Sequence, residues 1–381
     1  MNYSGFAIRK KRIEKDWSQE GLCKDICAVS YLSKIEQGKV EASGEIISAL
    51  FRKLGIEWIT DEEFLKEGKK FVEDWYDAVF SEDFKRISLL QEAFEKKFQV
   101  LENSPLAIDV FLLKDFDSDE ADVLDERLEI CMDSRQLALQ RLLGRNFEEA
   151  EKLYPCPFIY LRAGYVAYEK GDNISALENL QKAYMLASEE GRIHVMMLAK
   201  LYITNCYSNI GDIAAMEYHG TIAKRLALAL GETEFAETMD YNFYATRIEK
   251  GDFAEAYDYF SKLTNPSAFS LHKLAVCCEK LGKREEALEA IEQEKLADAD
   301  TIENKMLADM ACELISFRLL HENYLADSDY GKMLLDFFSR CRKQMPIGYA
   351  KFHLPWVLEW FTTNRQYKQA FELLKDFPEN M

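Results

Sequence analysis

A short motif recurs along most of this chain and constrains its fold more than any other feature. It begins with Gly-Asp or Gly-Lys and carries a small residue near its fifth place. The clear copies are GDNISA (171–176), GDIAAM (211–216), GDFAEA (251–256) and GKREEA (282–287). Weaker copies are RNFEEA (145–150), ENYLAD (322–327) and RQYKQA (365–370). Successive copies begin 26 to 43 residues apart, a spacing typical of arrays of repeated structural units.

Regular helical stretches flank every copy of the motif, so each repeat is predicted to be a pair of helices. The glycine ends one helix, and the small residue lets the next helix pack closely. The pattern resembles the tetratricopeptide repeat over nearly all of residues 70–377, although many of its periods exceed the usual ~34 residues. Stacked pairs of this kind form a right-handed superhelix with an extended concave face.

Composition supports an all-α fold. The 381 residues are 48% hydrophobic and 30% charged, which is enough for a sizeable buried core and for two or more domains. Seven prolines and 17 glycines are few for this length, whereas β-rich folds need frequent turn residues. Ala, Leu, Glu and Lys dominate instead, as expected of helical proteins.

Charge is distributed unevenly along the chain. The formal net charge is −19, yet residues 1–56 carry 10 Lys and Arg against 7 Asp and Glu. The rest of the chain carries 38 basic against 60 acidic side chains. A small basic end on a large acidic body suggests that the N-terminal part binds nucleic acid while the remainder repels it.

Four short helices are predicted in this basic part from the spacing of its apolar residues, over 5–15, 19–26, 29–37 and 43–54. Ser18 can cap the second helix through its hydroxyl, and Gly38 supplies the left-handed turn that ends the third. An apolar seam is expected to join the second and third helices, made of Leu22, Ile26, Leu32 and Ile35.

Packing that pair of helices across a tight turn leaves the outer face of the third helix free. The face carries small polar, aromatic and basic groups that can reach base edges in a major groove: Ser30, Tyr31, Lys34 and Gln37. The first turn of the second helix offers backbone N–H groups and the Gln19 side chain to a phosphate. These residues therefore predict a surface that binds double-stranded DNA.

The residues WSQEGLCKDICAVSYLSKIEQGKVEAS closely resemble the lambda-repressor-like helix-turn-helix family. The stretch ICAVSYLSKIEQGK is still more similar to the version in the RRNPP regulators, the peptide-responsive quorum-sensing regulators of Gram-positive bacteria. The resemblance implies an internal ion pair between Arg12 and Glu36. It also implies that four side chains face DNA: Gln19, Ser30, Tyr31 and Lys34.

Two departures from the family pattern affect the helices of this module. Ala28 stands where a Ser or Thr cap often precedes the recognition helix, and Gly21 within the second helix costs roughly 1 kcal/mol relative to Ala. Cys23 and Cys27 lie four residues apart, but no His or further Cys pair completes a metal site. We therefore predict that these cysteines pack in the interior, with no metal and no cofactor.

Three parts are predicted along the chain. Residues 1–60 form a helix-turn-helix DNA-binding domain, residues 61–80 a linker helix, and residues 81–381 a tetratricopeptide-like repeat domain for sensing and dimerisation. The helical pattern of the linker begins at about residue 57. The charge-rich segment DFDSDEADVLDE (115–126) is interpreted as a solvated turn and helix start.

The first helix of each pair is expected to line the concave groove with residues three to four places apart. Counting back from the motifs places amides, tyrosines and cations there: Asn205, Asn209, Asn242, Arg162, Tyr165, Tyr202, Tyr241 and Lys273. An Asn side chain can bond both the N–H and the C=O of an extended peptide, whatever the peptide sequence. Arg162 or Lys273 can bind a C-terminal carboxylate, and the tyrosines add contact area.

The resemblance to tetratricopeptide domains and RRNPP sensors singles out the asparagines, since Asn at these inward places holds peptide backbone in those families. By that likeness Asn205 and Asn242 come first, and Asn209 follows. An Asn within a helix is also poor for helix propensity and has no packing reason. Tyrosine at helical spacing is equally typical of the core of an array, so both interpretations stay open for the tyrosines.

Together these features predict a sequence-specific transcription regulator whose groove binds a short intracellular signalling peptide. A module of net charge +3 binds DNA weakly, so a homodimer on a palindromic operator is expected. The alternative is a DNA-binding regulator whose repeats bind a protein partner. A repeat-based phosphatase is a third hypothesis, but no His-Glu-x-x-His, Walker loop or nucleophile elbow occurs, and we expect no enzyme.

A cytoplasmic location without a membrane segment is expected. No stretch of about 18 apolar residues occurs, and no apolar run follows the basic residues at the N-terminus as in a secretion signal. The nine cysteines show no disulfide framework, which suits a reducing compartment.

Overall fold

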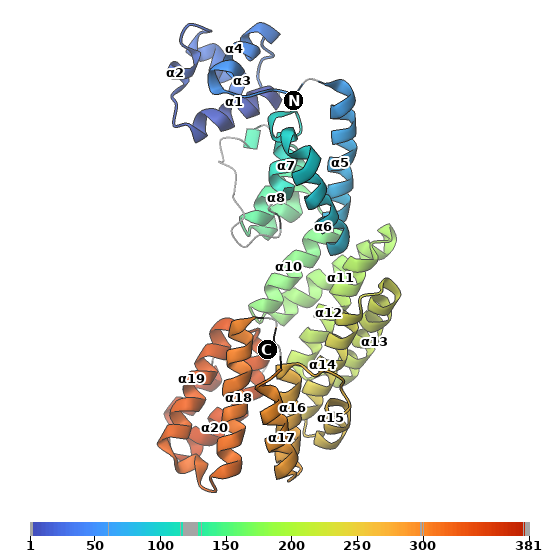
Figure 1. Ribbon diagram of the computed structural model, residues 1–381, viewed down its shortest axis with the longest axis vertical. Helices are drawn as coiled ribbons and strands as arrows, with labels where there is room; N and C mark the ends of the chain where they lie inside the picture. The colour runs from blue at the N-terminus through green and yellow to red at the C-terminus, as the bar shows by residue number, and fades with distance from the viewer. Residues whose placement is uncertain are drawn as a thin grey trace. The chain divides into compact units, whose positions relative to one another are not determined.

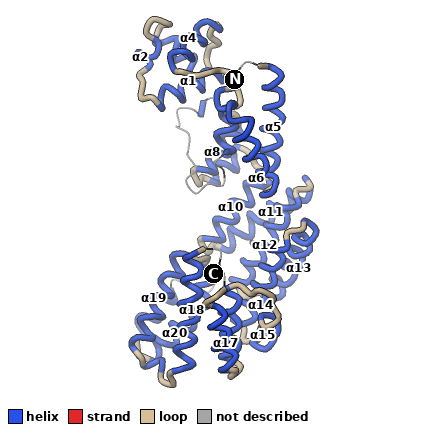
Figure 2. Tube along the Cα trace, viewed as in Figure 1, coloured by secondary structure: helices blue, strands red, loops and turns tan. Residues whose placement is uncertain are grey.

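The computed structural model describes residues 3–59, 61–114, 116, 129–130, 132–297, 299, 301–375 and 377. Within these residues every regular element is a helix, as Figure 2 shows. The predicted all-α class is therefore confirmed. Apart from Phe116, the acidic segment 115–126 lies outside the described residues.

The helices form two compact units. The first comprises Met1–Ala163 and Lys182–Val195, and the second comprises Gly164–Gln181 and Met196–Met381. Helices α10 (Pro157–Glu169) and α11 (Asn173–Glu190) contribute residues to both units.

The first unit begins with four short helices, as the sequence predicted. They are α1 (Tyr3–Glu14), α2 (Gln19–Cys23), α3 (Val29–Glu36) and α4 (Gly44–Leu54) (Figure 1). The predicted seam is confirmed: Leu22, Leu32 and Ile35 are fully buried, and Ile26 packs against them. Cys23 is buried in the same cluster.

The predicted caps of these helices are present. The Ser18 hydroxyl accepts a hydrogen bond from the backbone N–H of Gly21 at the start of α2, and Gly38 ends the α3 region with a φ of 65°. Ala28 precedes α3 without a side-chain cap, as expected from its methyl group. Gly5 brings α1 close to α3, because a Cβ at this position would lie 2.1 Å from the backbone oxygen of Ile35.

The rest of the first unit is a helical layer around an aromatic core. The helix predicted from about residue 57 begins at Glu62, because the Asp61 carboxylate caps it through the backbone N–H of Phe64. Trp75 is fully buried in the core and packs against Phe71. The elements are α5 (Glu62–Phe80), α6 (Phe84–Ala93), η1 (Phe94–Phe98), η2 (Gln99–Asn103), α7 (Ala107–Lys114), α8 (Ser134–Leu143) and α9 (Phe147–Leu153).

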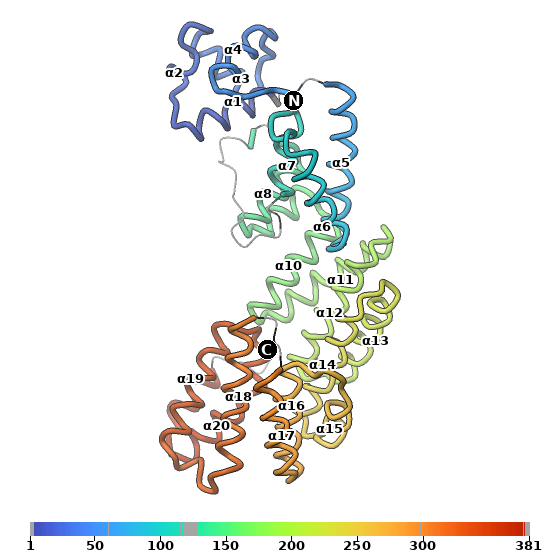
Figure 3. The backbone as a smooth tube through the Cα atoms, in the orientation of Figure 1, coloured from blue at the N-terminus to red at the C-terminus, as the bar shows by residue number. Residues whose placement is uncertain are grey.

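The second unit is an array of antiparallel helix pairs in which consecutive helices pack side by side (Figure 3). It continues from α11 with α12 (Ile193–Ile210), α13 (Ile213–Leu230), α14 (Thr233–Glu249), α15 (Phe253–Phe260), α16 (Ala268–Lys280) and α17 (Arg284–Glu294). The last elements are α18 (Ile302–Leu320), η4 (Tyr324–Ala326), α19 (Ser328–Gln344), α20 (Ile347–Thr363) and α21 (Tyr367–Lys375).

The sequence motif marks the turn inside a helix pair. Its four clear copies place their glycines in the left-handed region, with φ between 73° and 89°: Gly171, Gly211, Gly251 and Gly282. The small residue that follows is buried, as at Ala256. Arg145 and Arg365 take the same left-handed conformation in two of the weaker copies. The copy at 322–327 is different: it forms η4, and α19 starts only after the cap at Asp327.

Candidate functional site

A buried ion pair holds the N-terminal helices together. Arg12 of α1 donates from Nε and Nη2 to the two carboxylate oxygens of Glu36, at 2.6 and 2.8 Å. The Gln19 amide donates to the same carboxylate at 2.8 Å, and Arg12 also bonds the Trp17 carbonyl. Glu36 is 1% exposed, so this network fixes α3 on α1 and α2. The predicted Arg12–Glu36 pair is confirmed.

The outer face of α3 presents the groups predicted for DNA contact. Ser30 and Lys34 are exposed, and Tyr31 is half-buried against the core of the four helices. The Gln37 amide donates to the Ser33 hydroxyl at 3.1 Å and is half-buried. Gln19 differs from the other candidates, because the structure commits its amide to Glu36.

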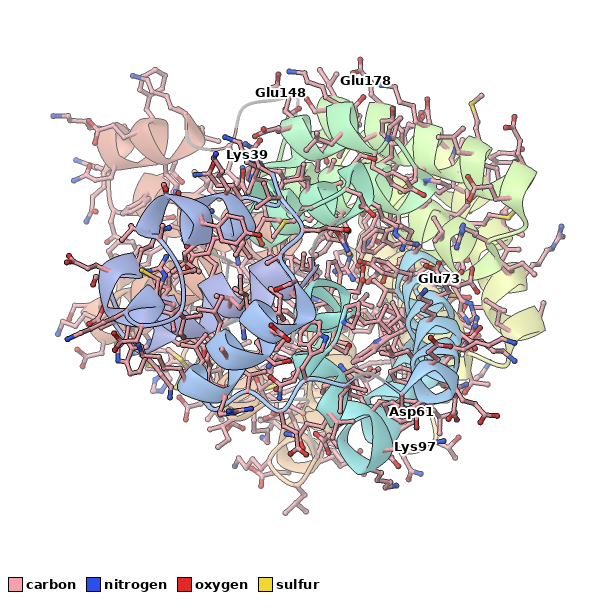
Figure 4. All side chains as sticks on the ribbon, turned by 90° about the horizontal axis from the view of Figure 1, so that it is seen from above. Lys39, Asp61, Glu73, Lys97, Glu148 and Glu178 are labelled. Atoms are coloured by element: carbon pink, nitrogen blue, oxygen red, sulfur yellow. The ribbon has the colours of Figure 1, made fainter. Side chains whose placement is uncertain are left out.

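Two further residues on this side were not predicted from the sequence. Val29, the first residue of α3, is 43% exposed, and an apolar side chain there can meet a thymine methyl group. Lys39 follows α3 and is also exposed (Figure 4). The seam pattern identifies buried positions, so it gave no signal for an exposed valine.

The second unit contains a cavity of about 200 Å³ lined by the first helices of successive pairs. Four of the predicted groove residues line it: Asn205 and Asn209 from α12, and Tyr241 and Asn242 from α14. Lys273 of α16 is a fifth. Counting back from the motifs thus selected residues that are far apart in the sequence and that line one cavity in the structure.

Side-chain amides and hydroxyls form a ladder between the helices at this cavity. The Asn242 amide donates to the Asn205 side-chain oxygen at 2.9 Å, linking α14 to α12. The Ser208 and Thr246 hydroxyls lie 2.6 Å apart one turn along the same helices. The Asn209 amide donates to the side-chain oxygen of Asn173 at 3.3 Å. These polar groups form hydrogen bonds mainly with one another, and a polar ligand can replace these bonds with its own.

The predicted tyrosines divide into two groups. The tilted rings of Tyr165 and Tyr202 pack against each other with centroids 4.9 Å apart, and neither residue lines the cavity. The Tyr165 hydroxyl donates to Glu169 at 2.7 Å. Tyr241 lines the cavity, and its buried hydroxyl lies beside Tyr349. Burial raises the pKa of Tyr241 well above its ordinary value.

Lys273 is an unusual component of the cavity, since its side chain is a buried cation. It is 2% exposed, and its Nζ lies 3.0 Å from the centroid of the Phe352 ring. Burial lowers the pKa of Lys273 to about 7, against the smaller opposing effect of the Glu249 carboxylate. Glu249 lines the same cavity.

Arg162 is not among the residues that line this cavity. Its guanidinium donates two hydrogen bonds to the carboxylate of Glu82, at 2.7 and 3.1 Å, and it lies over the Phe158 ring. Both charged residues belong to the first unit. The Glu82 side chain is only 3% exposed, so this pair is part of the interior of that unit.

Helix α20 supplies the rest of the cavity wall, which the sequence did not reveal. Tyr349 and Phe352 line the cavity, and the Lys351 Nζ donates to the backbone oxygen of Asn209 at 2.6 Å. A second cavity of about 610 Å³ adjoins the first and shares Asn209, Glu249 and Phe352 with it. The 66 residues 281–346 separate α20 from α16, and no local pattern indicates that the two helices meet.

A histidine pair joins α20 to α16 beside the cavity. The His353 Nδ1 lies 2.8 Å from the backbone oxygen of Tyr349, which can only accept, so Nδ1 donates. The His353 Nε2 is then the acceptor for the His272 Nε2, at 3.5 Å. Both rings are buried, which lowers the pKa of each well below its ordinary value. Two neutral imidazoles therefore hold the start of α20 on α16.

Residues 8–59 match the helix-turn-helix family. This match covers α2, α3 and α4, most of α1, and the buried Arg12–Glu36 pair. The N-terminal domain is a helix-turn-helix domain.

Relatives extend the likeness beyond this domain. The transcriptional activator NprA of Geobacillus stearothermophilus is 22% identical over an alignment of 277 positions, and the match covers 62% of this chain and 66% of that protein. The match therefore spans slightly less than two thirds of the relative's own length. Together with the helix-turn-helix domain, it supports the resemblance to RRNPP-type regulators and points away from an enzyme.

A solved structure shows the same fold. A Rap protein complexed with Competence and Sporulation Factor superimposes with a TM-score of 0.56 at 14% identity, over 83% of this chain and 100% of that chain. The predicted architecture of an all-α repeat array is thus confirmed by a known fold. Bacillus thuringiensis PlcR, in complex with the peptide PapR7 and DNA, also matches over 76% of this chain and 99% of its own, at 15% identity and a TM-score of 0.29. That score is too low to support a comparison of the two folds.

The described residues include neither a helix that could span a membrane nor a cluster of metal-binding side chains. No helix among them is long and apolar enough to cross a membrane. No group of three or more His, Cys, Asp or Glu side chains in this part of the chain is arranged to hold a metal ion.

Proposed function

We propose that this chain is a DNA-binding transcription regulator whose helix-turn-helix domain inserts α3 into a major groove. Ser30, Tyr31 and Lys34 supply the base contacts from the outer face of α3, with Gln37 at its end. The Arg12–Glu36 network supports this role because it fixes the orientation of α3 on the domain. Gln19 then acts through its hydrogen bond to Glu36, and the backbone N–H groups of α2 meet a phosphate.

A homodimer on a palindromic operator is part of the proposal. Residues 1–56 have a net charge of only +3, and few phosphate contacts give weak binding. Two domains that read two half-sites one helical turn apart multiply that affinity. The repeats supply the remaining surface of the chain, and the dimer contact is proposed to lie within them.

The array is proposed to bind a short peptide in its cavity, and the Asn205–Asn242 pair carries this part of the proposal. These two asparagines lie on neighbouring helices and face one cavity, where the Asn242 amide donates a hydrogen bond to the Asn205 side-chain oxygen. Each amide can instead bond the N–H and C=O of one peptide unit, so peptide backbone replaces one internal bond with several. Tyr241 offers a further hydroxyl on the cavity wall. The Rap structure with the same fold contains Competence and Sporulation Factor, which agrees with a ligand-binding array.

A ligand in this cavity touches helices from five different pairs. Its walls come from α10, α12, α14, α16 and α20, so filling it changes how these pairs pack. A ligand shifts the equilibrium between two arrangements only by its difference in affinity for them. We propose that this difference alters the spacing of the two helix-turn-helix domains in the dimer.

Mass spectrometry of small molecules co-purified with the full chain tests the peptide proposal. A bound peptide is expected with the wild-type chain and with Asn304→Ala, a change on α18 away from the cavity walls. Asn205→Ala with Asn242→Ala should reduce affinity by on the order of 1–3 kcal/mol for each buried group left unpaired. A protein partner retained equally by all three chains, with no peptide, would favour the alternative and refute this proposal.

A further inference from the structure

Two adjoining cavities of the second unit concentrate positive charge in an acidic protein. Residues 57–381 carry 38 basic against 60 acidic side chains. The cavity walls reverse this balance, with four lysines against two carboxylates. The lysines are Lys250, Lys273, Lys280 and Lys351, and the carboxylates are Glu249 and Glu359. Such a reversal at a concave site favours anionic ligands.

The innermost of these cations has no carboxylate within salt-bridge distance in the described part of the chain. Lys273 forms no salt bridge there, and its close contact is the face of the Phe352 ring. An ammonium group taken out of water is costly unless it is paired. A ring face offsets only part of that cost. A ligand carboxylate beside Lys273 would complete the pairing and would be held more strongly than at an exposed lysine.

The other lysines lie around the larger cavity, on different helices. The Lys351 Nζ is anchored by the backbone oxygen of Asn209, at 2.6 Å. The Lys250 Nζ lies against Gly211, in the turn between α12 and α13. Lys280 is exposed at the end of α16. A ligand that extends from the inner cavity into the larger one therefore passes between cations from three sides.

We propose that the ligand of this groove is an acidic peptide, with one carboxylate against Lys273 and at least one more among Lys250, Lys280 and Lys351. The inference rests on the proposed function, since it specifies the class of peptide that the array binds. In this proposal the asparagine pair binds the peptide backbone and provides affinity for any peptide. The lysines bind the acidic side chains and provide the selectivity for an acidic peptide.

The chemistry of the walls favours a peptide over a nucleotide or free phosphate. Phosphate sites commonly use arginine forks or rows of backbone N–H groups at helix N-termini. Among the described residues no arginine lines either cavity, and the cations are single lysines spread over the walls. Carboxylates spaced along an extended backbone match such a distribution, and the amide ladder lies between them.

Selection from synthetic peptide pools tests this inference. The full chain is mixed with random octapeptides in two pools, one containing Asp and Glu and the other containing Asn and Gln in their place. Retained peptides are identified by mass spectrometry. Enrichment of the acidic pool by about 10- to 100-fold is expected, the range for one hydrogen bond to a buried charged group. Equal enrichment of the two pools would overturn the acidic preference and leave peptide binding intact. Retention of neither pool would overturn the proposed function as well.

Matched lysine variants show which lysines cause the preference for the acidic pool. Lys273→Met should remove most of the preference for the acidic pool while keeping the chain folded. Lys262→Met, at an exposed lysine paired with Asp258 outside both cavities, should keep it. Lys280→Met is a second test at an exposed cavity position, where folding is not at risk, and should lower the preference by a smaller factor. An undiminished preference in both cavity variants would place the selective cations elsewhere and refute the assignment.

Discussion

Lys273 is predicted to cost stability in the free protein, so its replacement should stabilise the second unit. Lys273→Met removes a cation that is 2% exposed and keeps an unbranched side chain of similar size. Burial raises the pKa of Glu249, the nearby carboxylate, but its side chain is still exposed, so the change leaves no fully buried charge without a partner. Function and stability therefore oppose each other at this residue.

The magnitude follows from the lowered pKa. A fall from the ordinary 10.5 to about 7 corresponds to a cost on the order of 5 kcal/mol for the buried cation. The variant avoids this cost, but it also loses the contact between the ammonium group and the Phe352 ring, which stabilises the wild type by about 2 kcal/mol. We expect a net increase of about 1–3 kcal/mol in the free energy of unfolding below pH 7, as found when buried charges are replaced by apolar groups.

The gain should shrink as pH rises. Because the pKa of Lys273 is lower in the folded chain than in the unfolded chain, the folded state binds fewer protons between pH 7 and 10.5. The wild type therefore becomes more stable with rising pH in this window, by at most about 1.4 kcal/mol per pH unit, whereas the variant does not. Below pH 7 the lysine is charged in both states and the full cost remains.

Hydrogen exchange of the α16 and α20 amides, measured by mass spectrometry at pH 6 and pH 9, provides the assay. It reports opening of the second unit separately from the rest of the chain. Slower exchange in Lys273→Met at pH 6, with a smaller difference at pH 9 after correction for the intrinsic rate, supports the reasoning. Faster exchange in the variant at pH 6 would refute it, because the lysine would then stabilise the free protein.

Three further predictions concern the helix-turn-helix domain. Arg12→Met should destabilise it by about 3–5 kcal/mol, because the Glu36 carboxylate is left buried without its cation; unchanged hydrogen exchange in α3 would contradict this. Gly5→Ala should force α1 away from α3, since its methyl group would lie 2.1 Å from a backbone oxygen. The melting temperature followed by circular dichroism should therefore fall, and an unchanged melting temperature would contradict the clash. Tyr31→Ala with Lys34→Ala should abolish enrichment of any sequence from a random duplex pool while helicity stays unchanged, and retained sequence preference would exclude α3 as the reading helix.

The features that sequence predicted best depend on local chemistry. The Ser18 cap, the Gly38 turn and the Leu22–Leu32 seam are set by residues within a few places of one another. The glycine turns of the repeats were predictable for the same reason. The copy at 322–327 forms η4 instead of the left-handed turn, whereas Arg145 and Arg365 adopt that turn without a glycine.

The groove was only partly predictable, because its walls come from distant segments. Counting residues along one helix places Asn205 and Asn242 correctly on the cavity, since both lie on first helices of pairs. It cannot show that Glu82 is close enough to engage Arg162, because pairing depends on how segments about 80 residues apart pack. Lys351 was missed for the same reason, since its contact to α12 spans 142 residues.

The most direct test of the account measures one DNA affinity with and without ligand. The wild-type full chain first selects its preferred duplex from a random pool, and the affinity for that duplex is then measured with and without the co-purified peptide fraction. We expect the fraction to change the affinity at least about fivefold for the wild type, the lower range of allosteric coupling, and not for Asn205→Ala with Asn242→Ala. An equal change in both chains, or none in the wild type, would contradict control of DNA binding from the groove.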